Sequence, residues 1–389
     1  MAVNNMNFEQ AAAVLNEIRR QVTGVEAAAP ITEADFISVG QTVLRAGYDP
    51  VLSAITQVLA RTIFSNRPYK RKFDGIRRTA QEFGAITRKL AISDKDFEND
   101  VRFELVDGQS IDMFKVNKPV VLQLNFYGQV VYEKSMTIFR DQLNSAFQSS
   151  GQFGQFLAMV TQNVYDMLTQ AEENLARLTI ANFALAKISA NNGVIHLLQE
   201  YNAHTGASLT KATVYAPENF PNFIKWMYSR IETLSEMMTE RTNLYQVQVT
   251  GKEITRHTPR SEQNMYIYAP LLKEMKARVL ADTFNETMLE FNDVEPVNFW
   301  QSSQTPNTMQ GTPAVLQPSG EITVPSDPVT NNDVVGLIFD REALGYAVID
   351  EWAAPTPFNA KGGYTNQFWH NTKKYWNDLS EKGIVLLMD

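Results

Sequence analysis

The sequence predicts an α+β fold, because helix-like and strand-like patterns occupy separate stretches of the chain. Residues 8–22 and 153–190 place apolar side chains at intervals of three and four. Residues 101–126 and 334–388 instead contain short alternating or continuously apolar runs, which are typical of strands. With 389 residues, 44% of them hydrophobic, the chain can bury a substantial core and form two to three domain-sized units.

Three helices are predicted in the N-terminal region. The first covers residues 8–22. Thr32 stands three residues before Asp35, a pattern that resembles a capping box and starts the second helix. Asp49 suits the N-cap of a third helix, and Pro50 suits its first turn. The region therefore predicts a helical arm with a bend.

The stretch from Arg61 to Lys89 is basic, although the whole chain carries a formal net charge of −8. Such a cluster can neutralise packaged phosphate or bind an acidic partner, but a solvated helix face or salt bridges between subunits explain it at least as well. The acidic total charge excludes a protein whose whole surface binds nucleic acid. The candidate DNA- or subunit-contacting residues are Arg61, Arg67, Lys70, Arg71, Lys72, Arg77, Arg78, Arg88 and Lys89.

An extended hairpin is expected between residues 93 and 135, followed by one long helix. Apolar residues alternate through Val101–Leu105 and again through Leu122–Phe126. The length of this alternation and its charged flanks favour a hairpin that protrudes and contacts another chain, with an ordinary packed sheet as the alternative. The helix over residues 153–190 would be roughly 55 Å long, because a helix rises 1.5 Å per residue.

The C-terminal half mixes helices with short strands. The proline-rich stretch Gln301–Asn332 predicts an exposed loop. The apolar run Ile384–Met388 predicts a strand that is tucked into a sheet. The other expected elements are a helix through Phe223–Leu234, strands at Leu244–Val249 and Met265–Tyr268, a helix from Pro270, and strands at Val334–Phe339, Gly345–Ile349 and Tyr364–Trp376.

The sequence offers little catalytic chemistry. Motifs for phosphate-binding loops, dinucleotide binding, zinc proteases and serine hydrolases are absent, so no catalytic residue and no cofactor are predicted. The chain has no cysteine, which excludes disulfides and thiolate metal sites. No signal peptide or apolar membrane span is present, so no membrane partner is expected. The four histidines lie far apart in sequence, and no metal site is predicted from them: His196, His204, His257 and His370.

Two groups of residues leave alternatives open. The carboxylate pairs Glu172-Glu173 and Asp350-Glu351 could serve as general acid and base, but we expect solvated surface. The aromatic residues could stack sugars or bases, although a sheet core or subunit contact is favoured. These aromatic residues are Tyr364, Phe368, Trp369, Tyr375 and Trp376.

The order of helical arm, long hairpin, very long helix, mixed domain and returning strands resembles the Hong Kong ninety-seven type fold of tailed-bacteriophage major capsid (head) proteins. Several stretches carry the likeness, and those in the C-terminal half are similar in layout to the short-tailed phi-twenty-nine-like branch. The stretches are Thr32–Phe36, Gly47–Pro50, Arg61–Ser65, Met265–Lys273, Val335–Glu351 and Phe368–His370.

The resemblance implies a division of the chain into the named parts of that fold. The long helix would be the spine helix of the P-domain, and the proline-rich loop at 301–332 would belong to the A-domain. The expected parts are an N-terminal arm at 1–92, an E-loop at 93–135, the first part of the P-domain at 136–204, an A-domain at 205–348 and returning P-domain strands at 349–389.

The resemblance also implies a structural protein rather than an enzyme. Such a protein assembles in the host cytoplasm into pentamers and hexamers, which form the icosahedral or elongated head of the virion around double-stranded DNA. We expect a separate scaffolding protein, because only about 30 residues precede Thr32, together with a portal protein and non-covalent assembly. The alternatives are an encapsulin-like nanocompartment shell and a carbohydrate-active enzyme that uses the C-terminal aromatic residues beside Asp350 or Glu351.

Overall fold

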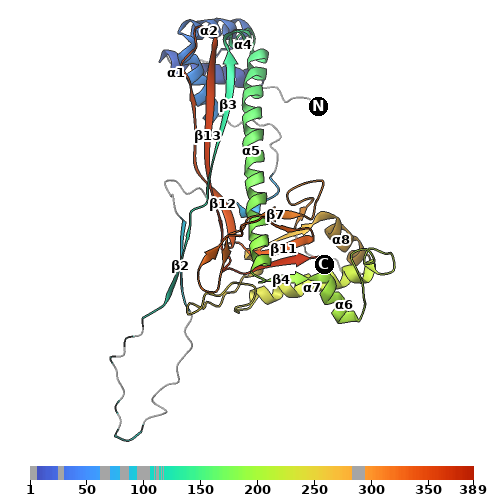
Figure 1. Ribbon diagram of the computed structural model, residues 1–389. Coiled ribbons are helices and arrows are strands. Elements are labelled where there is room, and N and C mark those ends of the chain that lie inside the picture. Colours follow the sequence, from blue (N-terminus) through green and yellow to red (C-terminus); the bar gives the residue numbers. More distant parts are fainter. Residues whose placement is uncertain are drawn as a thin grey trace.

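The molecule has a long stalk with helices at one end, a globular domain at the other and a projecting hairpin (Figure 1). The stalk consists of helix α5 (Ser150–Ser189) and a three-stranded sheet with the order β12-β13-β3. The strands are β3 (Gln129–Phe139), β12 (Leu344–Pro355) and β13 (Tyr364–Asn377). The computed structural model describes residues 7–24, 30–61, 71–78, 87–93, 106–108, 110, 114, 116, 118–282 and 294–389.

Helix α5 confirms the prediction of one long helix. It contains 40 residues, which corresponds to about 60 Å. The Ser149 side chain caps its start by accepting a hydrogen bond from the backbone N–H of Gln152. The first half of α5 packs against the N-terminal helices, and the second half enters the core of the globular domain. The helix therefore connects the two ends of the molecule.

The predicted N-terminal helices are present as α1 (Phe8–Thr23), α2 (Glu33–Arg45) and α3 (Tyr48–Arg61). The capping box of Thr32 and Asp35 is confirmed. Helix α3 begins at Tyr48, so Asp49 is not its N-cap; the Asp49 carboxylate instead accepts the backbone N–H of Phe358. Together with α4 (Arg140–Ala146) and α5, these helices enclose a separate apolar core.

The globular domain contains a five-stranded sheet with the order β4-β14-β11-β5-β6. One face of this sheet packs on the second half of α5 and the other on helices α6 to α8. The predicted C-terminal strand is confirmed, because it is buried between β4 and β11. The elements are β4 (Val194–His196), α6 (Leu197–Thr205), α7 (Phe220–Thr239), β5 (Gln263–Tyr268), α8 (Ala269–Asp282), β6 (Val294–Val297), β11 (Val334–Asp340) and β14 (Gly383–Leu387).

One sequence prediction in this domain is wrong and another is incomplete. Residues 244–249 form no strand. Tyr245 has a positive φ of 64°, and its carbonyl accepts hydrogen bonds from the Lys187 side chain and from the backbone N–H of Gly383. The stretch 301–332 is largely exposed loop, as expected, but it also contains four short strands and buries Met309 in the core beside α5. These strands are β7 (Met309–Gly311), β8 (Val315–Leu316), β9 (Ile322–Thr323) and β10 (Val329–Asn331).

Candidate assembly surface

The projecting hairpin begins with β1 (Thr87–Ile92), which pairs antiparallel with β2 (Val121–Phe126). Strand β1 was not predicted, because its residues were assigned to the basic arm. The expected first strand through Val101–Leu105 lies outside the described residues. The predicted second strand at Leu122–Phe126 is confirmed as β2. The first described strand of the hairpin therefore lies before residue 93, where the hairpin was expected to begin.

The two faces of the hairpin differ in burial. Ala91, Leu122 and Leu124 pack on the core of the globular domain. On the opposite face of β1, the side chains of Leu90 and Ile92 are 61% and 65% exposed. Large apolar side chains also remain exposed further along the hairpin, at Val106, Phe114 and Val116. Exposed large apolar side chains such as Leu90 and Ile92, two residues apart on one face of β1, are typical of a surface that a partner covers.

Lys89 fixes the base of the hairpin to the globular domain. Its Nζ lies 3.0 Å from a carboxylate oxygen of Asp378 and 3.3 Å from one of Glu342, and it donates a hydrogen bond to Glu381. Arg256 also contacts Glu381, at 2.6 Å. Burial lowers the pKa of Lys89, but Asp378 and Glu381 raise it more, so the net shift is upward. Burial raises the pKa of Glu381 to about 7, although Lys89 and Arg256 oppose that shift.

A second charged cluster joins the arm to the stalk. Arg71 contacts one carboxylate oxygen of Glu172 at 2.7 Å, and Lys373 contacts the other at 2.6 Å. Lys373 also contacts Glu351 at 2.5 Å. Glu172 lies on α5, whereas Lys373 and Glu351 lie on β13 and β12. This cluster therefore links Arg71 of the arm, the long helix and the three-stranded sheet.

The expectation that Glu172 and Glu173 are solvated is wrong, since both are buried. Glu172 is enclosed by its ion pairs, and Glu173 contacts Arg177 at 2.6 Å. Glu351 retains about half of its side-chain exposure. Burial raises the pKa of Glu351, but hydrogen bonds from Lys373 and Asn371 lower it more, so the net shift is downward. These carboxylates act as structural ion-pair partners.

Lys187 forms a third connection at the end of α5. Its side chain is completely buried, and its Nζ donates hydrogen bonds to the carbonyls of Tyr245 and Glu381 at 2.8 and 3.3 Å. Burial lowers the pKa of Lys187 to about 7, although Asp378 and Glu381 raise it. The C-terminal end of α5 is thereby connected to the segment that contains Tyr245 and to the segment that contains Glu381.

The described part of the basic stretch divides between internal contacts and exposed positions. Arg71 and Lys89 form the ion pairs above, and Arg78 donates hydrogen bonds to the carbonyls of Gly75 and Arg341. Lys72, Arg77 and Arg88 are exposed. Arg67 and Lys70 lie outside the described residues, and the Arg61 side chain is not described.

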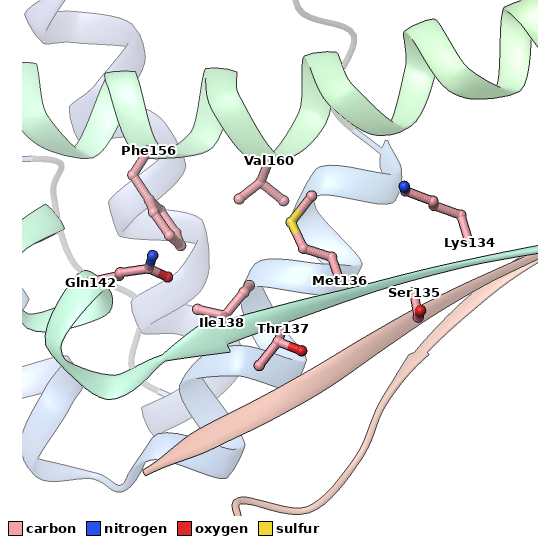
Figure 2. A pocket seen from close by; sticks show the side chains of 8 residues that line it. All are labelled: Lys134, Ser135, Met136, Thr137, Ile138, Gln142, Phe156 and Val160. Carbon is pink, nitrogen blue, oxygen red and sulfur yellow. The ribbon is translucent and has the colours of Figure 1, made fainter. Parts of the chain in front are cut away.

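A recess of about 320 Å³ lies between β3 and α5 (Figure 2). Met136 and Ile138 point from β3 toward α5, and Phe156 and Val160 point from α5 toward them. Ser135 and Thr137 lie on the other side of the strand. The helix therefore leaves open space beside this part of β3.

Within the described ranges, no three His, Asp or Glu side chains are grouped to hold a metal ion. His196 contacts Asp389 at 2.7 Å, and His370 stacks on Trp352 with ring centroids 4.0 Å apart. Of the helices that the structure describes, none combines the length and apolar character needed to cross a bilayer. The exposed features are surfaces suited to contact with other molecules.

The family described as Phi29-like phage major capsid protein matches residues 12–387 of this chain. The chain belongs to this family. It is therefore a structural protein of a tailed-phage capsid, and it is located in the virion. This result favours a phage capsid protein over an encapsulin-like shell or a carbohydrate-active enzyme. No curated protein matches the sequence.

Two solved structures share the fold of this capsid protein. A chain in the capsid structure of Staphylococcus phage Andhra has a TM-score of 0.55 and 12% identity, over 84% of this chain and 87% of that one. A chain in the structure of the head fiber and inner core protein gp22 of native bacteriophage P68 has a TM-score of 0.57 and 11% identity, over the same shares. The predicted Hong Kong ninety-seven type fold is confirmed.

Proposed function

We propose that copies of this capsid protein form the pentamers and hexamers of an icosahedral or elongated head that encloses double-stranded DNA. A separate scaffolding protein and a portal protein would act with it, and the subunits would associate without covalent bonds. The observation that carries this proposal is the projecting hairpin, which exposes apolar side chains while its base is tied to the body by Lys89.

This combination is suited to repeated assembly. The ion pairs around Lys89 fix the base of the hairpin to the globular domain, and those around Glu172 connect Arg71 with α5 and the three-stranded sheet. The exposed apolar side chains of the hairpin contribute a favourable free energy of burial only when a neighbouring subunit covers them. Because a shell repeats each contact many times, contacts of moderate strength are sufficient.

The proposal can be tested by expressing the chain alone and together with the scaffolding protein of the same phage. Negative-stain microscopy and sedimentation should show rings or particles of uniform curvature. A species that stays monomeric at 43.9 kDa at high concentration with scaffold present would contradict the proposal. Closed shells formed without scaffold around a cargo enzyme would instead favour the encapsulin-like alternative.

We further propose that Lys72 and Arg77 contact packaged DNA, since both side chains are exposed within the basic stretch. Replacing both with Gln should weaken salt-sensitive DNA association and reduce the salt slope by about one unit per lost phosphate contact. Lys361→Gln provides a control, because Lys361 is an exposed lysine outside this stretch. Unchanged DNA retention in the double variant would assign Lys72 and Arg77 to subunit contacts.

The division into arm, E-loop, P-domain and A-domain also remains a proposal. Strand β1 pairs with β2 along its whole length, and its residues lie before the expected start of the E-loop at 93. We therefore propose that the E-loop begins by Thr87. The A-domain would contain the five-stranded sheet, and the P-domain would contain α5 and the three-stranded sheet.

A further inference from the structure

Helix α5 ends in a turn that places Asn192 directly before Gly193. Asn191 has a positive φ of 47°, and the backbone N–H of Asn192 donates to the Lys187 carbonyl at 3.0 Å, as in a Schellman motif. Asn192-Gly193 is the only Asn-Gly pair in the sequence. Glycine has no side chain to shield its backbone nitrogen, so this nitrogen can approach the side-chain amide of the preceding residue. The main chain therefore attacks an asparagine side chain most readily at such a pair.

The side chain of Asn192 is held by two hydrogen bonds. Its Oδ1 accepts from the Lys187 Nζ at 3.2 Å, and its Nδ2 donates to the Gln246 carbonyl at 2.9 Å. These partners identify the two amide atoms, because an ammonium group only donates and a carbonyl only accepts. During an attack on Cγ, negative charge develops on Oδ1, where the Lys187 ammonium can stabilise it. Lys187 is thus placed to activate this amide.

A recess of about 420 Å³ adjoins Asn192 and gives water access to it. The lining residues of this recess include Gln246, Gln248 and Thr250, so its wall is largely polar and suited to water. Asn192 itself is only partly buried. Within the described residues, the backbone N–H of Gly193 donates no hydrogen bond. The attacking nitrogen, the amide carbon and water therefore meet at this turn.

We propose that Asn192 deamidates spontaneously, and that the fold directs the product to aspartate at this position, which then pairs with Lys187. The Gly193 backbone nitrogen forms a bond to the Asn192 Cγ and loses its proton. The bond between Cγ and Nδ2 breaks, and ammonia leaves with that proton. Water then adds to one carbonyl of the five-membered imide. Opening at Cγ gives aspartate with the normal main chain, whereas opening at the main-chain carbonyl gives isoaspartate.

The fold disfavours the isoaspartate product, which would add one methylene carbon to the main chain between residues 192 and 193. Both sides of this bond are held, because the Asn192 N–H donates to Lys187 and the Gly193 carbonyl accepts the backbone N–H of Val385 at 2.8 Å. Gly193 is also closely packed, since a Cβ atom on it would overlap the carbonyl oxygen of Gly383. A longer main chain has no space here, whereas aspartate leaves the main chain unchanged.

Aspartate at position 192 would supply Lys187 with a carboxylate in direct contact. The Lys187 side chain is completely buried, and the charged groups that act on it are Asp378 and Glu381. Its Nζ donates to the carbonyl of Glu381 and lies 5.6 Å from the centre of the Phe183 ring. Burial lowers the pKa of Lys187 to about 7, and a carboxylate within hydrogen-bond distance opposes this shift by stabilising the charged form. The reaction therefore strengthens this end of α5.

A slow reaction of this kind matters in a virion, because an assembled subunit is not replaced by a newly synthesised one. The modified fraction therefore grows for as long as the particle persists. The inference concerns chemistry within a single chain, so it goes beyond the proposed assembly into pentamers and hexamers and does not depend on it.

Peptide mass spectrometry tests the reaction directly. Folded subunits kept at mildly alkaline pH should convert the amide of Asn192 to an acid, mostly as aspartate. Asn191 is the internal control and should remain an amide, because a residue with a side chain follows it. The same chain unfolded in urea should yield mainly isoaspartate, since nothing then restrains the main chain. Conversion in urea without conversion in the folded subunit would show that the fold protects Asn192 and would overturn the proposal.

Lys187→Met tests the activation by the ammonium group. This variant lacks the donor to Oδ1, so conversion in the folded state should slow about tenfold, whereas conversion in urea should be unchanged. Thermal unfolding checks that the variant is folded. Equal rates in the two folded proteins would overturn the role of Lys187. Loss of ammonia without gain of water, with a stable bond between residues 187 and 192, would show that Lys187 itself attacks and would overturn the proposed step.

Asn192→Asp tests the consequence without the reaction. Its carboxylate should keep Lys187 charged in the folded state, so the rise in the free energy of unfolding between pH 7 and 10.5 should be lost. Asn191→Asp is the matched control, because Asn191 is exposed, and it should keep the rise. Identical pH profiles for the two variants would overturn the ion pair. All these measurements use unassembled subunits, so their failure leaves the shell role intact, and a failure to form particles leaves this inference intact.

Discussion

The two faces of β1 show how neighbouring basic residues acquire different roles. Lys89 faces the body, where buried Asp378 and Glu381 hold its ammonium group. Arg88 is the preceding residue and is exposed on the opposite face beside Leu90. Because side chains alternate along a strand, one charge binds the hairpin to its own chain and the next is available to another. Charge density alone therefore says little about function.

The largest expected effect on the free energy of unfolding is at the ion-pair cluster around Glu172 on α5. Lys373→Ala should reduce the free energy of unfolding by about 3 kcal/mol, because the buried Glu172 carboxylate loses one of its two cationic partners and keeps only Arg71. Chemical denaturation of the unassembled subunit measures this loss. Lys361→Ala is exposed and should change stability by less than about 0.5 kcal/mol. Equal stability of the two variants would show that the cluster contributes little.

Removing the internal charge of β1 should have the next largest effect. Lys89→Met leaves two buried carboxylates with less compensation and should cost about 2 kcal/mol. The hairpin should also separate more readily from the body. Faster hydrogen exchange of the β1 and β2 amides, with unchanged exchange in α5, would demonstrate that local loosening. Uniform acceleration throughout the chain would indicate general destabilisation instead.

The buried groups predict opposite pH dependences. Glu381 has a folded pKa of about 7, above its ordinary value, so it favours the folded state at low pH, and this contribution falls as the pH rises toward 7. Lys187 has a folded pKa of about 7, below its ordinary value of 10.5, so the free energy of unfolding should rise between pH 7 and 10.5.

Variants can separate these two contributions. In wild type, the free energy of unfolding should fall as the pH rises toward 7, and Glu381→Gln should remove this fall. It should rise again as the pH increases above 7, and Lys187→Met should remove this rise. Each slope should be at most about 1.4 kcal/mol per pH unit, since one proton is exchanged. Urea titrations at several pH values provide the measurement. Parallel pH profiles for wild type and Lys187→Met would contradict the assignment of the alkaline limb.

The smallest effect on stability is expected for the external charge of β1. Arg88→Gln should change the free energy of unfolding by less than about 0.5 kcal/mol, because the side chain is exposed. It should nevertheless reduce ring formation under conditions in which wild type assembles. Of these two adjacent residues, Lys89 would thus mainly affect stability and Arg88 would mainly affect assembly. A large loss of stability in Arg88→Gln would disprove this division.

Local patterns in the sequence were sufficient for much of the fold. The three- and four-residue apolar period predicted α5, and Thr32 with Asp35 predicted the start of α2, because helix hydrogen bonds and caps are formed within a few residues. The run at Ile384–Met388 predicted a buried final strand for a similar reason. Membership of the capsid family was likewise indicated by the order of these elements.

Tertiary structure decided the roles of the charged residues. Strand β1 was hidden in a basic stretch, since its partner β2 begins more than two dozen residues later and no local period marks the pairing. Glutamate is usually a surface residue, yet Glu172 is buried and forms ion pairs with Arg71 and Lys373, which come from distant parts of the chain. Burial and ion pairing depend on contacts between elements. The sequence alone therefore predicted the elements marked by local periods and caps, whereas strands without a local signal, and which charges stay available to a neighbour, were decided by packing.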